Sequence, residues 1–527
     1  MSRHQMFSHS FLVLLSALLL LGCSRSTQNE RDGGIAAITP ELAHRYVFTL
    51  AADSLLGRDT PSRELDIAAQ FIAEEFEASG LLPVNGSYLH DVGLGVVSLG
   101  PDNQLFITRD GAERSYTIKR QFTPFDMTAN GEASGEIVFA GYGITAPEYG
   151  YDDYEGIDVR GKIVFVLRHE PGEQDEQSTF KGAEATDYSN VSEKVQIAID
   201  HGARAVLVAT DPLNHGLLTP RGFPWPSLSK IIPDDALPVS IVGDEATKIP
   251  VVHVGEEVIT QLFGSVDELR EIQRAIDESV RPRSFALSGS RARVKTSTSV
   301  RPVPANNVLG LVEGRDPILK DQIVVVGAHY DHVGYRRSQG PGQDSVYNGA
   351  DDNASGTSAM LAVARAFGTA PERPRRSVLL MAFAGEEKGL LGSRAYTLNP
   401  ALPLEKTVAM INLDMVGRNS VDSLFIVGAP AAPELAEFTR QENAATGFVF
   451  SFDNSVTGRS DHASFVNKGV PAIAYFSGFH ADYHKVGDNP ELVSAMKVAK
   501  VAQLAFRTAW RIANDDQTYS IQKQQTP

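Results

Sequence analysis

With 527 residues, the chain exceeds what a single hydrophobic core usually organises, so we expect two or more domains. Its 48 basic and 65 acidic side chains give a net charge of −17, which argues against nucleic-acid binding, because that function needs a basic face. Hydrophobic residues make up 42% and charged residues 21% of the chain, a balance that is ordinary for a soluble globular protein.

Residues 1–23 have the pattern of an export signal. An apolar stretch from Phe11 to Leu21 follows Arg3 and ends in Leu-Leu-Gly-Cys at Cys23. Such a segment is removed from the mature protein and takes no part in the fold. The ending resembles a bacterial lipoprotein signal, which would leave a lipid on Cys23; a plain signal peptide with an incidental cysteine is the alternative. We therefore expect an exported protein tethered to a bacterial membrane. Ser24 favours the outer membrane, facing the periplasm or the exterior. Cys23 is the only cysteine, so no internal disulfide is possible.

Residues 24–38 form a polar linker, and residues 39–93 predict a small helical segment. Thr39-Pro40-Glu41 supplies a capping residue, a proline at the first helical position and an acid in the first turn, so a helix begins there and runs to about Leu50. A second helix is predicted over residues 64–79, and Gly80 ends it.

Residues 94–290 differ in sequence pattern from the helical segment before them, with short runs typical of β-strands separated by Gly, Pro and Asp. The runs lie at 136–144, 162–169, 205–210 and 249–255, with helices at 192–201 and after Gly255. None of the metal-type motifs described below falls in this stretch. We therefore expect an inserted accessory domain, β-rich and of α+β class.

Residues 291–515 predict the catalytic core, followed by a polar tail over 516–527. Strands are predicted at 324–329, 377–387, 408–417, 423–429 and 470–478, and helices at 354–367, 389–398 and 491–512. Alternating strands and helices indicate an α/β fold with a mostly parallel sheet covered by helices on both faces.

Five short motifs in this core carry chemistry. They are GAHYDHVG around His329, NGADDNASG around Asp351, AGEEKG around Glu386, INLDMVGR around Asp414 and DYHKVGDN around His484. Most of these side chains sit at strand carboxyl ends, where open α/β sheets place ligands. Histidine nitrogen and carboxylate oxygen suit zinc, so the set is typical of a two-metal hydrolytic site.

Two of the motifs pair a candidate ligand with a second acid. In His329-Tyr330-Asp331, both polar side chains leave the strand on the same side, so Asp331 could orient the imidazole. Asp351-Asp352 could complement a helix dipole, but the small residues around them favour a carboxylate that spans two metal ions.

Glu386-Glu387 ends an apolar run, and its adjacent acids point in different directions. One can therefore bind metal while the other acts as general base on an activated water. Asp414 interrupts an apolar strand, where an unpaired charge is costly, so we expect a metal there or a salt bridge to Arg418.

His484 completes the ligand count, and other residues compete for these roles. Arg459-Ser460-Asp461-His462 has the composition of a hydrolase triad, but its members are contiguous, whereas a working triad is assembled from distant segments. We interpret it as pocket wall or as support for the ligands. The rivals are His332, His462, His480 and Asp461.

On these five motifs and their order, the core resembles the co-catalytic zinc aminopeptidase family, whose clan includes glutamate carboxypeptidase and the transferrin receptor ectodomain. The stretches AGYGI, DYEGIDVRGKIVFVLRHEPG and AIDHGARAVLVATDP resemble a protease-associated domain. The resemblance implies two zinc ions per chain. His329 and Asp414 would hold one, Glu387 and His484 the other, Asp351 would bridge them, Glu386 would be the base and Asp331 would stand behind His329. It also implies a cis peptide bond between Asp351 and Asp352.

The implied activity is aminopeptidase action on peptides with a free N-terminus. A carboxypeptidase or dipeptidase is the nearest alternative and would need a cationic pocket, for which Arg418, Arg459 or Arg336-Arg337 are candidates. A single-zinc glutaminyl cyclase type of acyltransferase and a non-catalytic binding protein are further alternatives.

Overall fold

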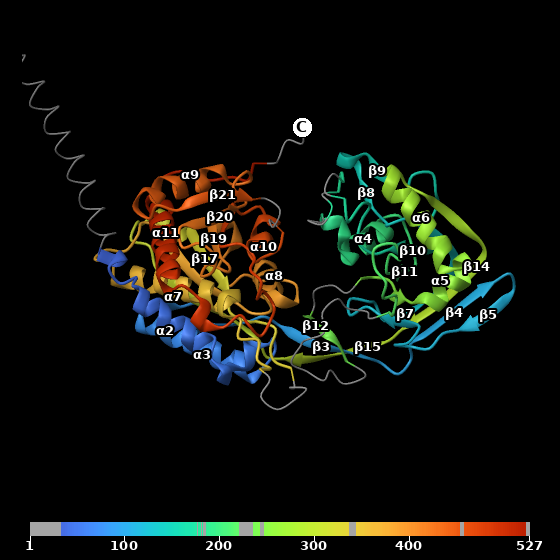
Figure 1. The fold of residues 1–527 in the computed structure, drawn as a ribbon, viewed down its shortest axis with the longest axis horizontal. Helices are drawn as coiled ribbons and strands as arrows, with labels where there is room; N and C mark the ends of the chain where they lie inside the picture. Colours follow the sequence, from blue (N-terminus) through green and yellow to red (C-terminus); the bar gives the residue numbers. More distant parts are fainter. Residues whose placement is uncertain are drawn as a thin grey trace, which may run out of the picture. The chain divides into compact units, whose positions relative to one another are not determined.

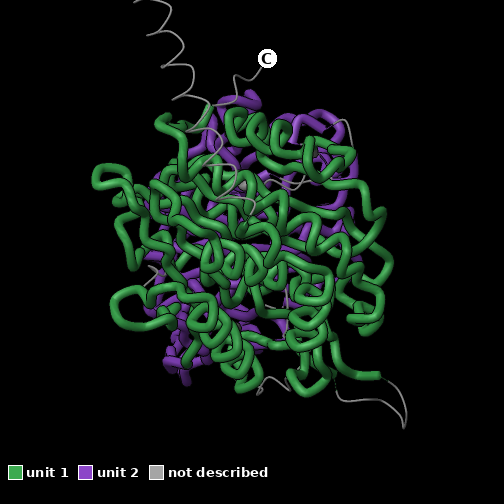
Figure 2. Tube along the Cα trace, turned by 90° about the vertical axis from the view of Figure 1, so that its left-hand side faces the viewer, with its two compact units in different colours: residues 1–92, 304–525 green, residues 93–303, 526–527 purple. Residues whose placement is uncertain are grey.

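The computed structural model describes residues 33–175, 178–180, 182, 186–220, 236–242, 247–336, 344–453 and 458–522. The export signal and Cys23 lie outside this range. The chain divides into two compact units, shown in green and purple in Figure 2: unit 1 covers residues 1–92 and 304–525, and unit 2 covers 93–303 with the last two residues.

Unit 1 is built on a nine-stranded sheet (Figure 1). Its central strands β18 (Ser377–Phe383), β17 (Ile323–His329), β19 (Thr407–Leu413) and β22 (Ala472–Phe476) run parallel. Antiparallel strands flank them, with β16 (Asn306–Val312) beside β18 and β20 (Ser423–Val427) beside β22. The outer members are β1 (Leu82–Pro83), β2 (Leu89–Asp91) and β21 (Val449–Asp453). The expected α/β fold class is confirmed.

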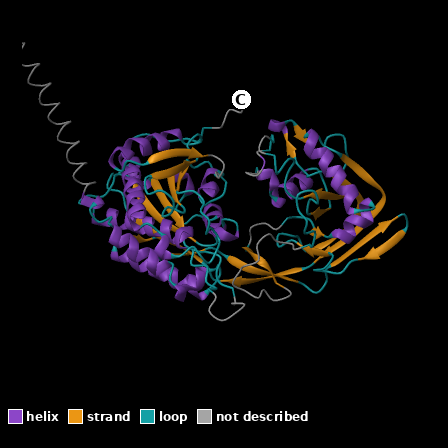
Figure 3. Cartoon of the chain, viewed as in Figure 1, coloured by secondary structure: helices purple, strands orange, loops and turns teal. Residues whose placement is uncertain are grey.

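The central strands are long apolar runs because helices cover both of their faces (Figure 3). On one face, Val325 and Met410 share a hydrophobic cluster with Tyr396 of α8 (Leu391–Leu398) and Phe465 of α10 (His462–Val466). Helices α7 (Gly356–Thr369) and α11 (Ala495–Asn514) also contact β17.

Further helices of unit 1 pack on these elements. Helices α2 (Pro40–Leu50) and α9 (Pro433–Glu442) pack on α11, and α3 (Arg63–Ala78) packs on β16. Helix α11 begins at Ala495 rather than at residue 491, because the Ser494 side chain accepts a hydrogen bond from the Lys497 amide and caps the helix there.

Unit 2 contains an eight-stranded sheet whose parallel centre is β7 (Gly131–Ala140), β10 (Ile163–Leu167), β11 (Ala205–Ala209) and β13 (Val251–Val254). Alternate residues pack on opposite faces. Phe165 shares a hydrophobic cluster with residues of α5 (Glu256–Phe263) and α6 (Val266–Ser279) on one face of the sheet. Val164, the preceding residue, packs with residues of α4 (Val191–Asp200) on the other face. The sheet is completed by β4 (Gln104–Arg109), β5 (Ala112–Ser115), β6 (Phe122–Pro124) and β14 (Ser284–Thr296).

Two smaller sheets also belong to unit 2. One has the order β12 (Ala236–Ile241), β3 (Leu94–Leu99), β15 (Thr298–Val303), and the other joins β8 (Thr145–Ala146) to β9 (Tyr151–Asp152). Because β14 pairs with β4 and β7 and β15 pairs with β3, residues 291–303 lie in unit 2 and not, as expected, in the core. Among the described residues, no helix combines the length and apolarity needed to cross a membrane.

Candidate metal and catalytic site

The ends of three adjacent parallel strands position four of the expected site residues. His329 is the last residue of β17, and Asp414 directly follows β19. Strand β18 ends at Phe383, not at the acid pair, because Gly385 has a φ of 74° and turns the chain away from the strand. Glu386 and Glu387 therefore lie in a single helical turn just beyond that strand. All four side chains gather at the carboxyl edge of the sheet.

A first cluster forms around the imidazole of His329, which is almost completely buried. Its Nε2 atom lies 3.3 Å from Oδ1 of Asp414 and 3.3 Å from Oδ1 of Asp352. These three side chains offer atoms that lie within 4.8 Å of one another and form one group that could hold a metal ion.

A second cluster forms around His484 and uses the other oxygen of the same aspartate. The Nε2 atom of His484 lies 3.0 Å from Oδ2 of Asp352 and 3.0 Å from Oε2 of Glu387. His332 completes the cluster, with Nδ1 2.6 Å from Oε1 of Glu387 and 3.7 Å from Oδ2 of Asp352. His332 was expected only as a rival ligand. It stands in the GAHYDHVG motif with His329, but the motif does not indicate its contact with Glu387.

Asp352, not Asp351, is the carboxylate shared by the two clusters. The side chain of Asp351 turns away from them: Oδ1 accepts a hydrogen bond from the amide of Gly417 at 2.6 Å, and Oδ2 lies 3.4 Å from Nε2 of His480. The expected bridging role of Asp351 is therefore wrong in this geometry. The cis peptide bond also lies one residue later than expected, between Asp352 and Asn353.

Glu386 and Asp331 lie on either side of the His329 ring. Oε2 of Glu386 is 3.9 Å from Nε2 of His329, within reach of the first cluster. Oδ1 of Asp331 lies 3.6 Å from Nδ1 of the same ring and accepts a hydrogen bond from the Glu386 amide at 3.1 Å. Thr60 donates a hydrogen bond to the other oxygen of Asp331. Asp331 is thus fixed behind His329 and is tied to the turn that carries Glu386.

The titratable groups perturb one another strongly. Burial raises the pKa of Glu386 well above its usual range, and the charges of Glu387 and Asp414 add to that effect against the opposing influence of His329. Although burial opposes the shift, contacts with Asp352 and Glu387 raise the pKa of His484 to about 10. The pKa of Asp352 is held well below its usual range by His329 and His484, against the effect of burial. Such a concentration of acids needs compensating positive charge, which a metal ion or protonated imidazoles can supply.

The donor chemistry fits zinc. Each cluster offers imidazole nitrogen and carboxylate oxygen, the usual zinc ligands of sites without cysteine. Nε2 of His484 lies 3.0 Å from an oxygen of Asp352 and 3.0 Å from an oxygen of Glu387, so a neutral imidazole there would offer its lone pair to an ion held by those carboxylates.

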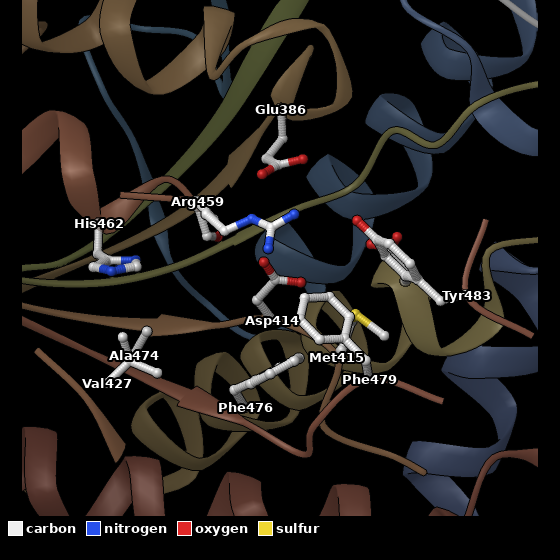
Figure 4. Close-up of a pocket in the computed structure, with 12 residues that line it drawn as sticks. Glu386, Asp414, Met415, Val427, Arg459, His462, Ala474, Phe476, Phe479 and Tyr483 are labelled. Atoms are coloured by element: carbon white, nitrogen blue, oxygen red, sulfur yellow. The ribbon is translucent and has the colours of Figure 1, made fainter. Parts of the chain in front are cut away.

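A pocket opens beside the clusters and is shown in Figure 4. Asp352, Glu386 and Asp414 line its polar part. The remainder is largely apolar and is formed by Met415, Val427, Ala474, Phe476, Phe479 and Tyr483. Arg459 extends its guanidinium into this space, and its carbon Cζ lies 5.4 Å from the centre of the Phe479 ring.

The other residues of interest take supporting places. His462 lines the pocket, and Asp461 is fully buried, which raises its pKa to about 7. Arg418 forms ion pairs with Asp482 at 2.6 Å and Asp488 at 3.6 Å rather than with Asp414.

Comparisons with known proteins agree with this geometry. Residues 307–509 match the model of Peptidase family M28, and residues 133–262 match that of the PA domain. A probable zinc metalloprotease of Pyrenophora teres f. teres is 29% identical over 348 residues, covering 53% of this chain and 69% of the relative. Leupeptin-inactivating enzyme 1 of Streptomyces exfoliatus is 35% identical over 180 residues, covering 34% and 37%. Aminopeptidase NAALADL1 of Rattus norvegicus is 26% identical over 423 residues, covering 67% of this chain and 53% of the relative.

The alignments with the Streptomyces and rat proteins thus span only about a third and a half of those relatives' lengths. Among solved structures, an aminopeptidase from Aneurinibacillus sp. strain AM-1 superposes with a TM-score of 0.52 at 19% identity, covering 93% of this chain and 97% of that one. At this identity the likeness shows a shared fold.

Proposed function

We propose that the chain is a zinc-dependent exopeptidase, an aminopeptidase that removes N-terminal residues from peptides, because residues 307–509 match the model of Peptidase family M28 and residues 133–262 match that of the PA domain. One observation carries the proposal. Asp352 presents one oxygen to each of two histidine-carboxylate clusters, and Glu386 stands within 3.9 Å of the first.

The site would hold two zinc ions that share Asp352. One ion would take His329 and Asp414, and the other would take Glu387 and His484, with His332 beside it. When bound, the pair would polarise the scissile carbonyl and lower the pKa of the attacking water.

Glu386 is proposed as the general base that accepts a proton at its carboxylate and returns it to the leaving amine. Its backbone amide is held by Asp331, which also lies behind the ring of His329. Asp331 is thus a positioning residue: it fixes both the ligand ring and the turn that carries the base.

The pocket supports an apolar side chain at the N-terminal position of the substrate. The carboxylates at one end would attract a free α-ammonium group, while Met415, Val427 and Phe476 offer an apolar wall to the adjoining side chain. Blocking the amino group by acetylation would remove the charge that these carboxylates attract.

Arg459 favours a second candidate, a dipeptidase or carboxypeptidase. Its guanidinium enters the same pocket as Glu386 and Asp414, where it could pair with the terminal carboxylate of a short substrate. A dipeptide would satisfy the carboxylates with its amine and Arg459 with its carboxylate at the same time.

Mass spectrometry of peptide digests separates these functions. The chain from residue 24 onward, supplied with zinc, would be incubated with peptides that differ only in N-terminal acetylation and C-terminal amidation. Loss of residues from free N-termini alone, abolished in Glu386→Gln, is expected for an aminopeptidase. Cleavage that requires a free C-terminus and is lost in Arg459→Gln would instead establish the carboxylate-dependent alternative. Conversion of an N-terminal glutamine to pyroglutamate on the intact peptide, with release of ammonia and no cleavage of a peptide bond, would indicate the cyclase type of reaction.

We also propose that the protein is exported and anchored to a bacterial membrane by a lipid on Cys23. The support is the apolar segment from Phe11 to Leu21 and the Leu-Leu-Gly-Cys sequence that ends it. Metabolic labelling with a fatty-acid analogue would test it, with incorporation expected in the natural chain and lost in Cys23→Ala. Labelling that is equal in both would contradict the anchor.

A further inference from the structure

Unit 2 contains a second group of metal-type side chains, on residues outside the peptidase motifs. His169, Glu173, Asp211 and His215 each offer one nitrogen or oxygen atom within 4.8 Å of those of the other three. No metal-type motif was expected in this region, so this cluster is an addition to the sites that the sequence predicts. The four residues lie on two segments that are distant in sequence, so no single short motif contains all of them.

The two segments occupy equivalent positions at the ends of neighbouring strands. Strand β10 ends at Leu167 and strand β11 at Ala209, and the two strands pair in parallel. His169 and Asp211 are each the second residue beyond their strand, and Glu173 and His215 follow them by four residues. The cluster therefore sits at the carboxyl edge of a parallel pair, the place where open α/β sheets bind ligands.

The donor atoms are already close together. Nδ1 of His169 lies 2.5 Å from Oδ1 of Asp211 and 3.8 Å from Oε2 of Glu173. Nε2 of His215 lies 2.9 Å from the same Glu173 oxygen and 3.6 Å from Oδ2 of Asp211. Ligands around a tetrahedral zinc ion at about 2.1 Å are separated by roughly 3.4 Å, so these distances bracket the required spacing.

Surrounding contacts hold the four side chains in place. The side chain of Asp211 is completely buried, and its carbonyl oxygen accepts a hydrogen bond from the His215 amide. Asn214 donates a hydrogen bond to Glu173, and the rings of His169 and His215 stack with centroids 4.3 Å apart. Gln273 of α6 fixes the intervening loop by accepting a hydrogen bond from the Leu213 amide at 2.7 Å. A preorganised set of this kind loses little conformational freedom when it binds an ion.

We propose that His169, Glu173, Asp211 and His215 bind one zinc ion as a structural site in the PA domain. Four protein ligands close the coordination sphere, so this ion would have no open position for a substrate or a reactive water. It would instead tie the loop after β10 to the loop after β11. The proposal does not rest on the peptidase function.

The competing arrangement is a pair of metal-free histidine-carboxylate hydrogen bonds. Arg168 lies close enough to contribute positive charge toward Asp211 and Glu173, so charge alone does not decide between them. The two arrangements differ in zinc content, which is directly measurable.

The test compares zinc per chain in three forms of the full chain after dialysis against zinc and then against zinc-free buffer. They are the natural protein, the double variant His169→Asn/His215→Asn and the single variant His201→Asn. His201 is a histidine of the same unit that stacks on Tyr154 outside the cluster, so it is the matched control. We expect the double variant to retain one zinc ion fewer than the natural protein and the control to retain the full content.

Diffraction at the zinc absorption edge gives a second measurement that does not depend on a variant folding. An anomalous peak between the four side chains in crystals of the natural protein grown without added zinc is expected. Equal zinc content in all three forms, or a peak that appears only after soaking in excess zinc, would show an adventitious ion only and would overturn the proposal. If the double variant does not fold, Glu173→Gln replaces it, with the same loss expected.

Discussion

Nδ1 of His332 lies 2.6 Å from Oε1 of Glu387, while Oε2 of the same carboxylate faces His484 at 3.0 Å. His332 therefore holds Glu387 in the orientation that presents its other oxygen to the second cluster. We predict that His332→Phe, which removes this contact and keeps an aromatic ring, weakens zinc binding at the second cluster by about 10- to 100-fold. Titration with a competing chelator measures the affinity.

His332→Gln separates two roles of the imidazole. A glutamine can still donate a hydrogen bond to Glu387 but is a poor zinc ligand. Partial recovery of affinity in His332→Gln relative to His332→Phe would indicate that His332 orients Glu387. Equal losses would indicate direct coordination, and no loss in either variant would contradict any role.

The adjacent acids Asp351 and Asp352 provide a matched pair for the shared carboxylate. Asp352→Asn is expected to release zinc, because both clusters lose an oxygen ligand. It should also lower kcat by more than roughly 10- to 100-fold, which is the loss expected when a residue that only hydrogen-bonds to a metal ligand is removed. Asp351→Asn should keep its zinc, since that side chain faces Gly417 and His480. Asp351→Asn should lower the free energy of unfolding by about 1–3 kcal/mol, because the hydrogen bonding of a buried polar group is disturbed. Chemical denaturation measures this change. The reverse pattern would restore Asp351 as the bridge.

Glu386 and Glu387 form a second matched pair. Glu386→Gln is expected to lower kcat about 100- to 10,000-fold while zinc content is unchanged, because a general base is removed and no ligand is lost. Glu387→Gln should lower zinc content as well as activity, because Glu387 contacts His484 at 3.0 Å. Metal analysis of both variants beside single-turnover kinetics checks the assignment. Loss of zinc in Glu386→Gln would make that residue a ligand.

The sequence predicts where this site lies in the fold better than it predicts which side chain takes which role. The strands over β17 and β19 are apolar runs that end in a polar residue, so the positions of His329 and Asp414 follow from the pattern alone. Asp351 and Asp352 are identical neighbours that differ only in the direction of their side chains: Asp351 faces Gly417 and His480, whereas Asp352 faces both clusters. The motif does not specify that direction, so the assignment was off by one residue.

The prediction of the unit boundary was wrong, and the cluster in unit 2 was missed, for a different reason. Residues 291–303 were predicted to belong to the core, but the strands that pair with them, β3, β4 and β7, lie far earlier in the chain. Likewise, His169 and Asp211 are separated by 42 residues and meet only because β10 and β11 pair. Pairing between distant segments is set by the tertiary fold, which local periodicity does not record.

Zinc uptake should release protons. In the metal-free protein, the contacts with Asp352 and Glu387 raise the pKa of His484 from 6.5 to about 10, against the effect of burial, so this ring is protonated at neutral pH. A zinc ligand must be neutral imidazole, so binding displaces that proton. Zinc affinity should therefore rise with pH between 6.5 and 10, by about tenfold per pH unit for each proton released.

The metal-free protein should show the opposite trend in stability. A histidine whose folded pKa is raised contributes stability that is complete below pH 6.5 and is lost as the pH rises toward about 10. Calorimetric titration of zinc in buffers with different ionisation enthalpies measures the protons released, and denaturation of chelator-treated protein across this range measures the stability. Proton-neutral zinc binding would mean that His484 is not a ligand.

The apolar wall of the pocket should control which N-terminal residue is removed. Ala474 is a small residue on β22 that lines this wall beside Phe476, and it is almost fully buried. Replacing it by leucine fills space that a large substrate side chain would occupy, but leaves the carboxylates and the proposed metal ligands untouched. We expect Ala474→Leu to lower kcat/KM for substrates with N-terminal leucine or phenylalanine by about 10- to 200-fold, the discrimination that a small change of fit in an apolar pocket produces. An alanine substrate needs little of that space, so its kcat/KM should change much less, and zinc content should be unchanged. If both substrates lose activity equally, the substrate side chain lies elsewhere and the wall formed by Ala474 and Phe476 does not select it.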